Sequence, residues 1–261
     1  MTTLSLEKID DADGGDGALV LVSGYISDTE TPRETDFRWW DGFRSAGWDG
    51  ALYLLNWDAS TPVSEHVLAP MPISLTLPGG AFAFIPADVA AGMGSAVLHW
   101  RKVRDRAEAI GREELLPFLD KKLDEDSVTL VGHSVGSRIV HFAMRAAADD
   151  GASLADVILC GGTESADEDW EAAMEGLEGN LLNVFHPRDR VLSFFERTFR
   201  SKRPVGLSAL ELEHDRAFDL DGSEIKPGEW RKPNHWIYRY VIEEACADLF
   251  AGTIAVQAAA S

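Results

Sequence analysis

The stretch that decides the fold is Val128-Thr-Leu-Val-Gly-His-Ser-Val-Gly136, which runs directly into Ser137-Arg-Ile-Val-His-Phe-Ala-Met144. Its first four residues are apolar or β-branched, as in a buried strand, and the second run has a helical pattern. Between them, Ser134 has a glycine two residues before it and another two residues after it. Small residues at those positions leave room for a sharp turn from strand to helix. The pattern predicts that such a turn presents the Ser134 hydroxyl at the end of the strand.

A base for Ser134 would come from one of the histidines that follow it in the chain. A serine hydroxyl is a weak nucleophile at neutral pH until a base takes its proton. This turn is typical of chains that carry serine, acid and histidine in that order. We favour His235, which lies directly before the last predicted helix, and His214 in a charged run is the runner-up. His141 lies on the helix after Ser134 and points away, and His186 ends a strand.

The acid that orients the histidine is predicted to be Asp189. Such an acid holds the imidazole in the correct tautomer and stabilises its cation. Asp189 follows the predicted strand 181–185, and a carboxylate just past the carboxyl end of a late strand can reach the base. Glu164 and Asp167, after the preceding strand, are alternatives. Asp189 could instead serve only as the N-cap of the helix predicted over 191–200.

Two backbone N–H groups are predicted to form the oxyanion hole. One is the N–H of Val135, directly after the serine, and the other comes from the loop after the first core strand. That loop is Val22-Ser-Gly-Tyr-Ile-Ser-Asp28, in which Gly24 lets the backbone turn close to the site. The Tyr25 N–H is therefore the expected second donor.

Apolar runs alternate with helical patterns along the chain. We expect strands at 18–24, 51–57, 127–132, 156–160 and 181–185, and helices at 34–46, 97–122, 135–148, 191–200 and 235–250. Strands that are apolar on both faces and separated by helices indicate a parallel sheet covered on both sides. We therefore expect one α/β domain over residues 1–261 with an α/β-hydrolase fold, a mostly parallel central sheet flanked by helices on both faces. The segments 58–96 and 201–233 break the alternation and are expected to form lid-like insertions or to pack over the sheet edge.

The composition bears on partners and cofactors. The 261 residues carry a formal net charge of −20, and nucleic acid is excluded as a partner because phosphate binding needs a basic stripe. The two cysteines, Cys160 and Cys246, are expected to be small buried apolar residues. Histidines and cysteines are few and not clustered at ligand spacing, so we expect no metal and no organic cofactor.

Two segments bear on location. Residues 1–17 are acidic and lack the basic and then apolar signature of a secretory signal, so we expect a cytoplasmic protein. Val67 to Ala87 is uncharged and long enough to cross a bilayer. It contains four prolines, and a lipid-exposed helix could not satisfy its backbone across so many breaks. We expect no transmembrane span there, while peripheral membrane contact stays open.

Four stretches of the sequence resemble a known family. They are Ser23-Gly-Tyr-Ile26, Trp39-Trp40 leading to Leu54-Leu-Asn-Trp57, Val128 to Val140, and Asn183-Val-Phe-His-Pro-Arg-Asp-Arg-Val191. The family is the α/β-hydrolase-like group of unassigned activity that includes fungal and animal transmembrane and coiled-coil domain proteins and bacterial relatives. The resemblance implies Ser134, Asp189 and His235 as the triad. Relatives often carry a membrane-associated segment, which here is broken by proline, and alanine where this chain has Ser137.

Together these features predict a serine hydrolase that acts on carboxylic esters, of esterase or lipase type, through a Ser-His-Asp triad and an acyl-enzyme. The substrate is expected to be a small-molecule or lipid-like acyl ester, because the apolar run Leu68 to Ile85 suggests an acyl pocket or lid. The same triad would serve a thioesterase or a peptidase. The alternative is a non-catalytic interaction protein on a hydrolase scaffold. Its partner surface would be exposed tryptophans at Trp39, Trp40, Trp170 and Trp230, although packing in the core is the commoner role of such residues.

Overall fold

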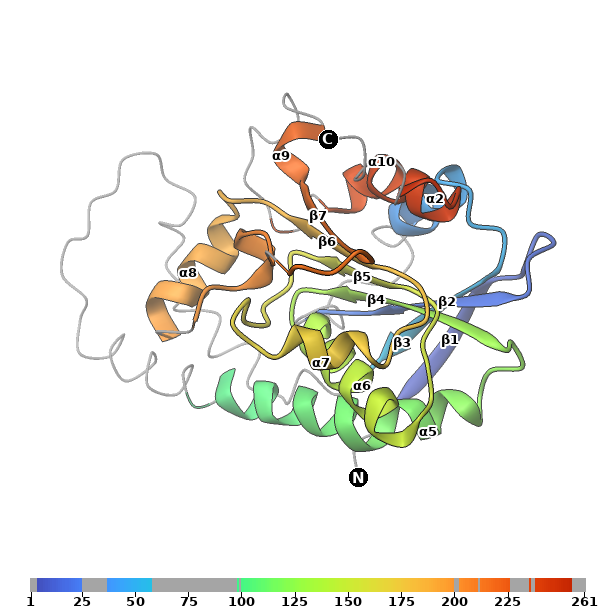
Figure 1. Ribbon diagram of the computed structural model, residues 1–261, viewed down its shortest axis with the longest axis horizontal. Coiled ribbons are helices and arrows are strands. Elements are labelled where there is room, and N and C mark those ends of the chain that lie inside the picture. The colour runs from blue at the N-terminus through green and yellow to red at the C-terminus, as the bar shows by residue number, and fades with distance from the viewer. Residues whose placement is uncertain are drawn as a thin grey trace.

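The fold is a single sheet with helices on both faces (Figure 1). The structure is a computed structural model, and it describes residues 4–24, 37–57, 98, 100–199, 202–210, 212–225, 235 and 238–254. Within these residues, seven strands pair in the order β1-β3-β2-β4-β5-β6-β7. They are β1 (Ser5–Asp10), β2 (Gly17–Val22), β3 (Ala51–Asn56), β4 (Ser127–His133), β5 (Val157–Cys160), β6 (Leu181–Phe185) and β7 (Ala217–Asp221).

The direction of the strands brings their ends to one edge. In the described sheet only β1 and β3 pair antiparallel, and the other neighbours are parallel. The inner strands are apolar on both faces, as β2 illustrates by being buried at every position, because helices cover both sides. Since β2 to β7 run the same way, their carboxyl ends meet at one edge. Strand β4 ends at His133, so Ser134 lies at that edge.

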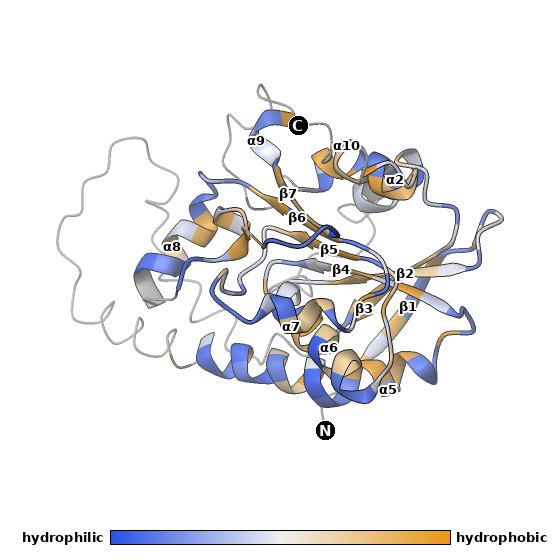
Figure 2. Cartoon of the chain, in the orientation of Figure 1, coloured by the Kyte–Doolittle hydropathy of each residue, from blue (hydrophilic) through white to orange (hydrophobic). Residues whose placement is uncertain are grey.

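Helices cover the two faces in separate layers. On one face α2 (Phe37–Ser45) packs against α10 (Tyr238–Phe250). The other face carries the helical residues 100–109, a π-helical turn η3 (Ile110–Glu114), α5 (Leu115–Asp120), α6 (Gly136–Asp150) and α7 (Trp170–Met174). Figure 2 shows apolar strands between helices whose polar residues lie outward. Each face has its own apolar cluster, one around Ile139 and Met144 of α6 and one around Phe43 and Tyr238.

The expected α/β-hydrolase architecture is confirmed, with two differences at the sheet edges. The five expected strands occur within two residues of their predicted bounds. The edge strands β1 and β7 were not predicted, and β7 lies inside the segment 201–233 that we expected to be irregular. Both carry polar side chains and are less buried than the inner strands. The chain between β6 and β7 also contains α8 (Arg190–Phe199) and η4 (Val205–Leu207), and α9 (Gly222–Ile225) follows β7.

The tryptophans predicted as a partner surface are buried where the structure describes them. Trp39, Trp40 and Trp170 are 4%, 6% and 3% exposed, so the expectation of an exposed surface is wrong for these three. They pack against the sheet because indole rings bury a large apolar area. Trp230 lies outside the described residues. Cys160 and Cys246 are free and buried, as expected.

Several expectations concern segments that the structure does not describe. The segment 58–96, which includes the apolar run 67–87, lies outside the described residues, and so does Tyr25. Among the residues that are described, no helix combines the length and the apolar character needed to cross a bilayer.

Candidate active site

Ser134 occupies the turn that the sequence predicts. Its φ is 55°, and it is the one non-glycine residue with positive φ in the described part of the chain. This left-handed conformation costs energy for residues with a Cβ and persists where the surroundings enforce it. A Cβ on Gly136 would lie 2.3 Å from the carbonyl oxygen of Val22, and one on Gly132 would lie 2.8 Å from Ser137 Cα. Both flanking glycines are therefore required by the close approach of the strand and the helix.

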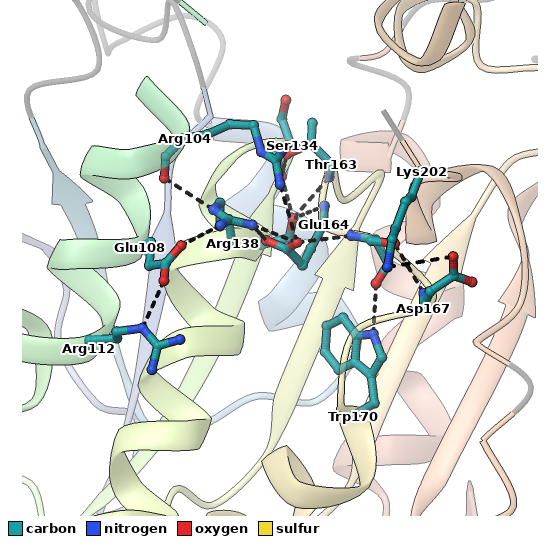
Figure 3. A network of polar contacts seen from close by, with 12 residues as sticks. Arg104, Glu108, Arg112, Ser134, Arg138, Thr163, Glu164, Asp167, Trp170 and Lys202 are labelled. Carbon is teal, nitrogen blue, oxygen red and sulfur yellow. Dashed lines mark hydrogen bonds and ion pairs between the residues drawn. The ribbon is translucent and has the colours of Figure 1, made fainter. Parts of the chain in front are cut away.

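Hydrogen bonds hold the backbone of the turn. The Ser134 carbonyl accepts from Ser137 Oγ at 2.6 Å and from the Thr163 N–H at 3.1 Å. The Ser134 N–H donates to the carbonyl of Cys160, also at 3.1 Å. Figure 3 shows Ser134 and Thr163 together at the top of a polar network that continues into the helices. The strained turn is thus anchored to the segment that follows β5.

Asp189 and His235 form a buried pair at the same edge of the sheet. His235 Nδ1 lies 2.7 Å from Asp189 Oδ2, and the two residues are 6% and 4% exposed. The other carboxylate oxygen, Oδ1, accepts from the N–H groups of Val191 at 2.9 Å and Leu192 at 3.1 Å. Asp189 therefore fills both roles weighed from the sequence, because one oxygen caps α8 and the other binds the imidazole.

Tyr238 is a third member of this pair that the sequence analysis did not identify. Its hydroxyl donates to Asp189 Oδ2 at 3.2 Å. Burial acts to raise the pKa of Asp189, but the charge and hydrogen bond of His235 outweigh it and hold that pKa below its usual range. The signal was available in the sequence, because Tyr238 follows His235 by three residues and this spacing puts both on one side of a helical turn.

The second ring nitrogen of His235 is not engaged by the described residues. His235 Nε2 is buried and has no hydrogen-bond partner among the described residues, so the described structure contains no hydrogen bond from Ser134 Oγ to it. The two residues are linked through His133, whose ring centroid lies 5.0 Å from that of His235.

The other histidines lie in different surroundings. His214 precedes β7, so it lies at the amino end of the parallel strands, across the sheet from Ser134. His186 Nδ1 accepts from the Arg188 N–H inside the turn that leads to Asp189. His141 is 1% exposed and packs on the Trp170 ring at 4.5 Å.

The two alternative acids are engaged elsewhere. Glu164 is fully buried, and its oxygens lie 2.7 and 2.5 Å from Nη1 of Arg138. Arg138 in turn donates to Glu108 at 2.5 Å, as Figure 3 shows. Asp167 is exposed and lies 4.0 Å from Lys202. Of the three candidate carboxylates, Asp189 is the one that contacts His235.

Of the two predicted oxyanion donors, the structure describes Val135 and does not describe Tyr25. Val135 directly precedes α6, and the first N–H groups of a helix have no partner within the helix. Tyr25 lies outside the described residues, but Gly24 before it packs against the turn, because a Cβ there would lie 2.7 Å from Ser134 Cβ. No cluster of three His, Cys, Asp or Glu side chains that could hold a metal occurs in the described part of the chain.

The sheet order and the strand–turn–helix at Ser134 define the protein as a member of the α/β-hydrolase fold class. A comparison with protein families matches residues 85–239 to the family described as "Protein of unknown function (DUF726)". The match covers more than half of the chain, which therefore belongs to this family. It includes Ser134, Asp189 and His235.

The chain is also similar to individual proteins. A rice protein described as "Transmembrane and coiled-coil domain-containing protein STS1" is 26% identical over 217 residues. The alignment covers 74% of this chain and 31% of the rice protein, so the chain spans about a third of that relative's length.

Two solved structures are similar at low identity. An alpha-beta serine hydrolase homologue from Coxiella burnetii has 11% identity and a TM-score of 0.39, over 97% of this chain and 91% of that one. Carboxyl esterase 2 from Tuber melanosporum has 11% identity and a TM-score of 0.38, over 94% of this chain and 82% of that one.

Proposed function

We propose that the protein is a serine hydrolase that cleaves carboxylic esters through an acyl-enzyme. The observation that carries the proposal is the buried contact of 2.7 Å between His235 Nδ1 and Asp189 Oδ2, at the edge of the sheet where the strained turn carries Ser134. A carboxylate on Nδ1 keeps the proton there, which leaves Nε2 as the basic nitrogen. His235 Nε2 has no hydrogen-bond partner in the described structure and is available for this role.

In the proposed reaction Ser134 Oγ attacks the ester carbonyl carbon while His235 Nε2 takes the hydroxyl proton. The N–H groups of Val135 and Tyr25 hold the negative charge on the carbonyl oxygen. The bond to the alcohol breaks, and the alcohol leaves with the proton from His235. Water then attacks the acyl-enzyme, gives a proton to His235 and releases the carboxylic acid, and Ser134 regains its proton.

The proposed substrate is a lipid-like or other small acyl ester. The apolar composition of Leu68 to Ile85 supports this substrate class. Thioesters and amides would use the same three residues, because a triad does not choose the leaving group. Cys160 and Cys246 are free thiols, which supports a reducing compartment such as the cytoplasm.

The test combines covalent labelling with turnover. A fluorophosphonate probe should label the purified wild-type protein on Ser134, and the Ser134→Ala variant should lose both labelling and hydrolysis of nitrophenyl esters. Ser153→Ala is the matched control, because its hydroxyl is exposed and donates to Glu178 at 2.6 Å. A wild-type protein that neither labels nor turns over esters of any acyl chain length would overturn the proposal. A preference for acetyl over long-chain esters would exclude the lipid-like substrate.

A further inference from the structure

Two histidine rings face each other at the site, and only one of them belongs to the proposed triad. His133 ends β4, directly before Ser134, and is 3% exposed. Its ring centroid lies 5.0 Å from that of His235, with an angle of 31° between the planes. On another side it meets the Trp39 ring edge to face at 5.5 Å. The His133 ring thus packs between Trp39 of α2 and His235, the proposed base.

The contact also includes the backbone of the base. His133 Nε2 lies 3.4 Å from the carbonyl oxygen of His235, a long hydrogen bond. A carbonyl oxygen can only accept, so His133 Nε2 carries the proton and Nδ1 does not when the ring is neutral. Nδ1 points toward the end of β2, since a Cβ on Gly24 would lie 3.3 Å from it. The His133 ring therefore lies beside both His235 and Gly24, and Gly24 belongs to the predicted oxyanion loop.

The surroundings of His133 and His235 favour a proton on His235 and not on His133. Burial lowers the pKa of His133 to about 3, and the neighbouring charge of His235 acts in the same direction. The hydrogen bond to the His235 backbone and the charge of Asp189 act to raise this pKa, and the charge of Arg239 on α10, the smallest of these effects, acts to lower it. Asp189 binds His235 directly, and Tyr238 donates to the same carboxylate. A proton taken from Ser134 is therefore stabilised on His235.

We propose that His133 is a positioning residue for the base: its Nε2–H holds the His235 backbone, and its neutral ring supports the His235 ring. This inference rests on the proposed hydrolase function and goes beyond it, because His133 touches neither the nucleophile's hydroxyl nor the reacting carbonyl in the mechanism above. Its effect passes through the position of His235. A loss of positioning of about 1 Å in a catalytic group can reduce turnover far more than it reduces stability.

Three variants separate the functions of the ring. His133→Gln keeps an N–H donor near the position of Nε2, whereas His133→Phe keeps the aromatic contact and removes the donor. His141→Phe is the matched control, because His141 is an equally buried histidine on α6 that packs on Trp170, away from Ser134. For each variant we would measure kcat, KM, the rate of Ser134 labelling by the fluorophosphonate, and the thermal unfolding midpoint.

We expect His133→Phe to lower kcat and the labelling rate about tenfold, because a displaced His235 takes the Ser134 proton less efficiently. KM should not change, His133→Gln should recover most of the loss, and His141→Phe should react like the wild type. Equal kcat in His133→Phe and wild type would overturn the inference and leave the proposed function intact. Absence of wild-type labelling would overturn both.

A measurement on the unaltered protein keeps the inference testable if a variant fails to fold. Histidine-selective ¹⁵N NMR should show His133 as the neutral Nε2–H tautomer at every pH from about 5 to 9, because its pKa lies far below that range. A His133 ring that titrates within this range, or that carries its proton on Nδ1, would contradict the proposed hydrogen bond to His235.

Discussion

Arg138 and Glu164 form a buried ion pair directly beneath the turn that carries Ser134. Arg138 Nη1 lies 2.7 and 2.5 Å from the two oxygens of Glu164, which is fully buried. Arg138 also bonds Glu108 and the backbone carbonyl of Arg104. Figure 3 shows how the guanidinium joins the helical residues 100–109, α6 and the segment after β5. The pair therefore ties together the three elements behind the turn.

Arg138→Met is expected to destabilise the fold by about 3–5 kcal/mol, because it leaves the Glu164 carboxylate buried without its main partner. The double variant Arg138→Met/Glu164→Leu should recover most of that loss, since it removes both charges. Chemical unfolding of the two variants measures the difference. Lys202→Ala breaks an exposed pair with Asp167 and serves as the control, with a loss below about 1 kcal/mol. If the single and double variants were equally unstable, the pair would have no electrostatic role.

Asp189→Asn is expected to separate the two functions of Asp189. Asparagine caps helices about as well as aspartate, so α8 and the unfolding midpoint should change little. The amide cannot stabilise the His235 imidazolium and favours the wrong tautomer, so kcat should fall by about 10⁴-fold. Steady-state kinetics and thermal unfolding on the same preparation provide the check. A variant that kept more than about a tenth of the wild-type kcat would remove Asp189 from the mechanism.

The two glycines that touch the turn should respond differently to substitution by alanine. In Gly136→Ala the new Cβ would meet the Val22 carbonyl, a backbone atom that cannot move aside, so the protein should lose about 1–3 kcal/mol of stability. In Gly24→Ala it would meet the side chain of Ser134. Displacement of the nucleophile should cost about 10²-fold in the labelling rate. Equal effects of the two variants on labelling at matched stability would contradict this assignment.

His141 should make the fold sensitive to acid. Burial lowers its pKa to about 4 from the ordinary histidine value of 6.5, so between these values the unfolded chain binds the proton and the folded protein does not. The free energy of unfolding should therefore fall as the pH falls from 6.5 to 4, by about 3 kcal/mol for this residue.

The corresponding test is His141→Phe. Neither ring nitrogen of His141 has a hydrogen-bond partner among the described residues, so the substitution removes a buried polar group without breaking a bond there. The variant should be at least as stable as wild type at pH 7, and its stability should depend less on pH. Part of the dependence should remain, because burial also lowers the pKa of His133. Identical pH profiles for variant and wild type would exclude His141 as the cause.

The strands of the sheet interior could be predicted from the sequence, and the edge strands could not. A strand such as β2 is apolar at every position because helices cover both faces, and this leaves a continuous apolar run. Strand β1, Ser-Leu-Glu-Lys-Ile-Asp, is mostly exposed and carries charges that water accepts. Strand β7, Ala-Phe-Asp-Leu-Asp, is half-buried. Strand β1 pairs with β3, and β7 pairs with β6. A local sequence pattern carries no information about such pairing between distant segments.

The sequence by itself determined the turn at Ser134. The strand, the two glycines and the helix are contiguous, so the pattern that predicts the turn lies within one short stretch of sequence. The order of residues along the chain limited the candidate acids and histidines that could act with Ser134 to a few. Among the acids, Glu164, Asp167 and Asp189 remained open, because nothing in a linear sequence reports which carboxylate another side chain will neutralise.

Only the tertiary structure decided which of these three carboxylates contacts His235. Asp189 meets His235 because β6 and β7 are parallel and deliver their following loops to the same edge of the sheet as β4. Glu164 instead pairs with Arg138 on α6. The contact of His133 with His235 likewise joins residues about a hundred positions apart. Contacts of this kind arise from packing of the sheet against its helices, so they exist only once the whole domain has folded.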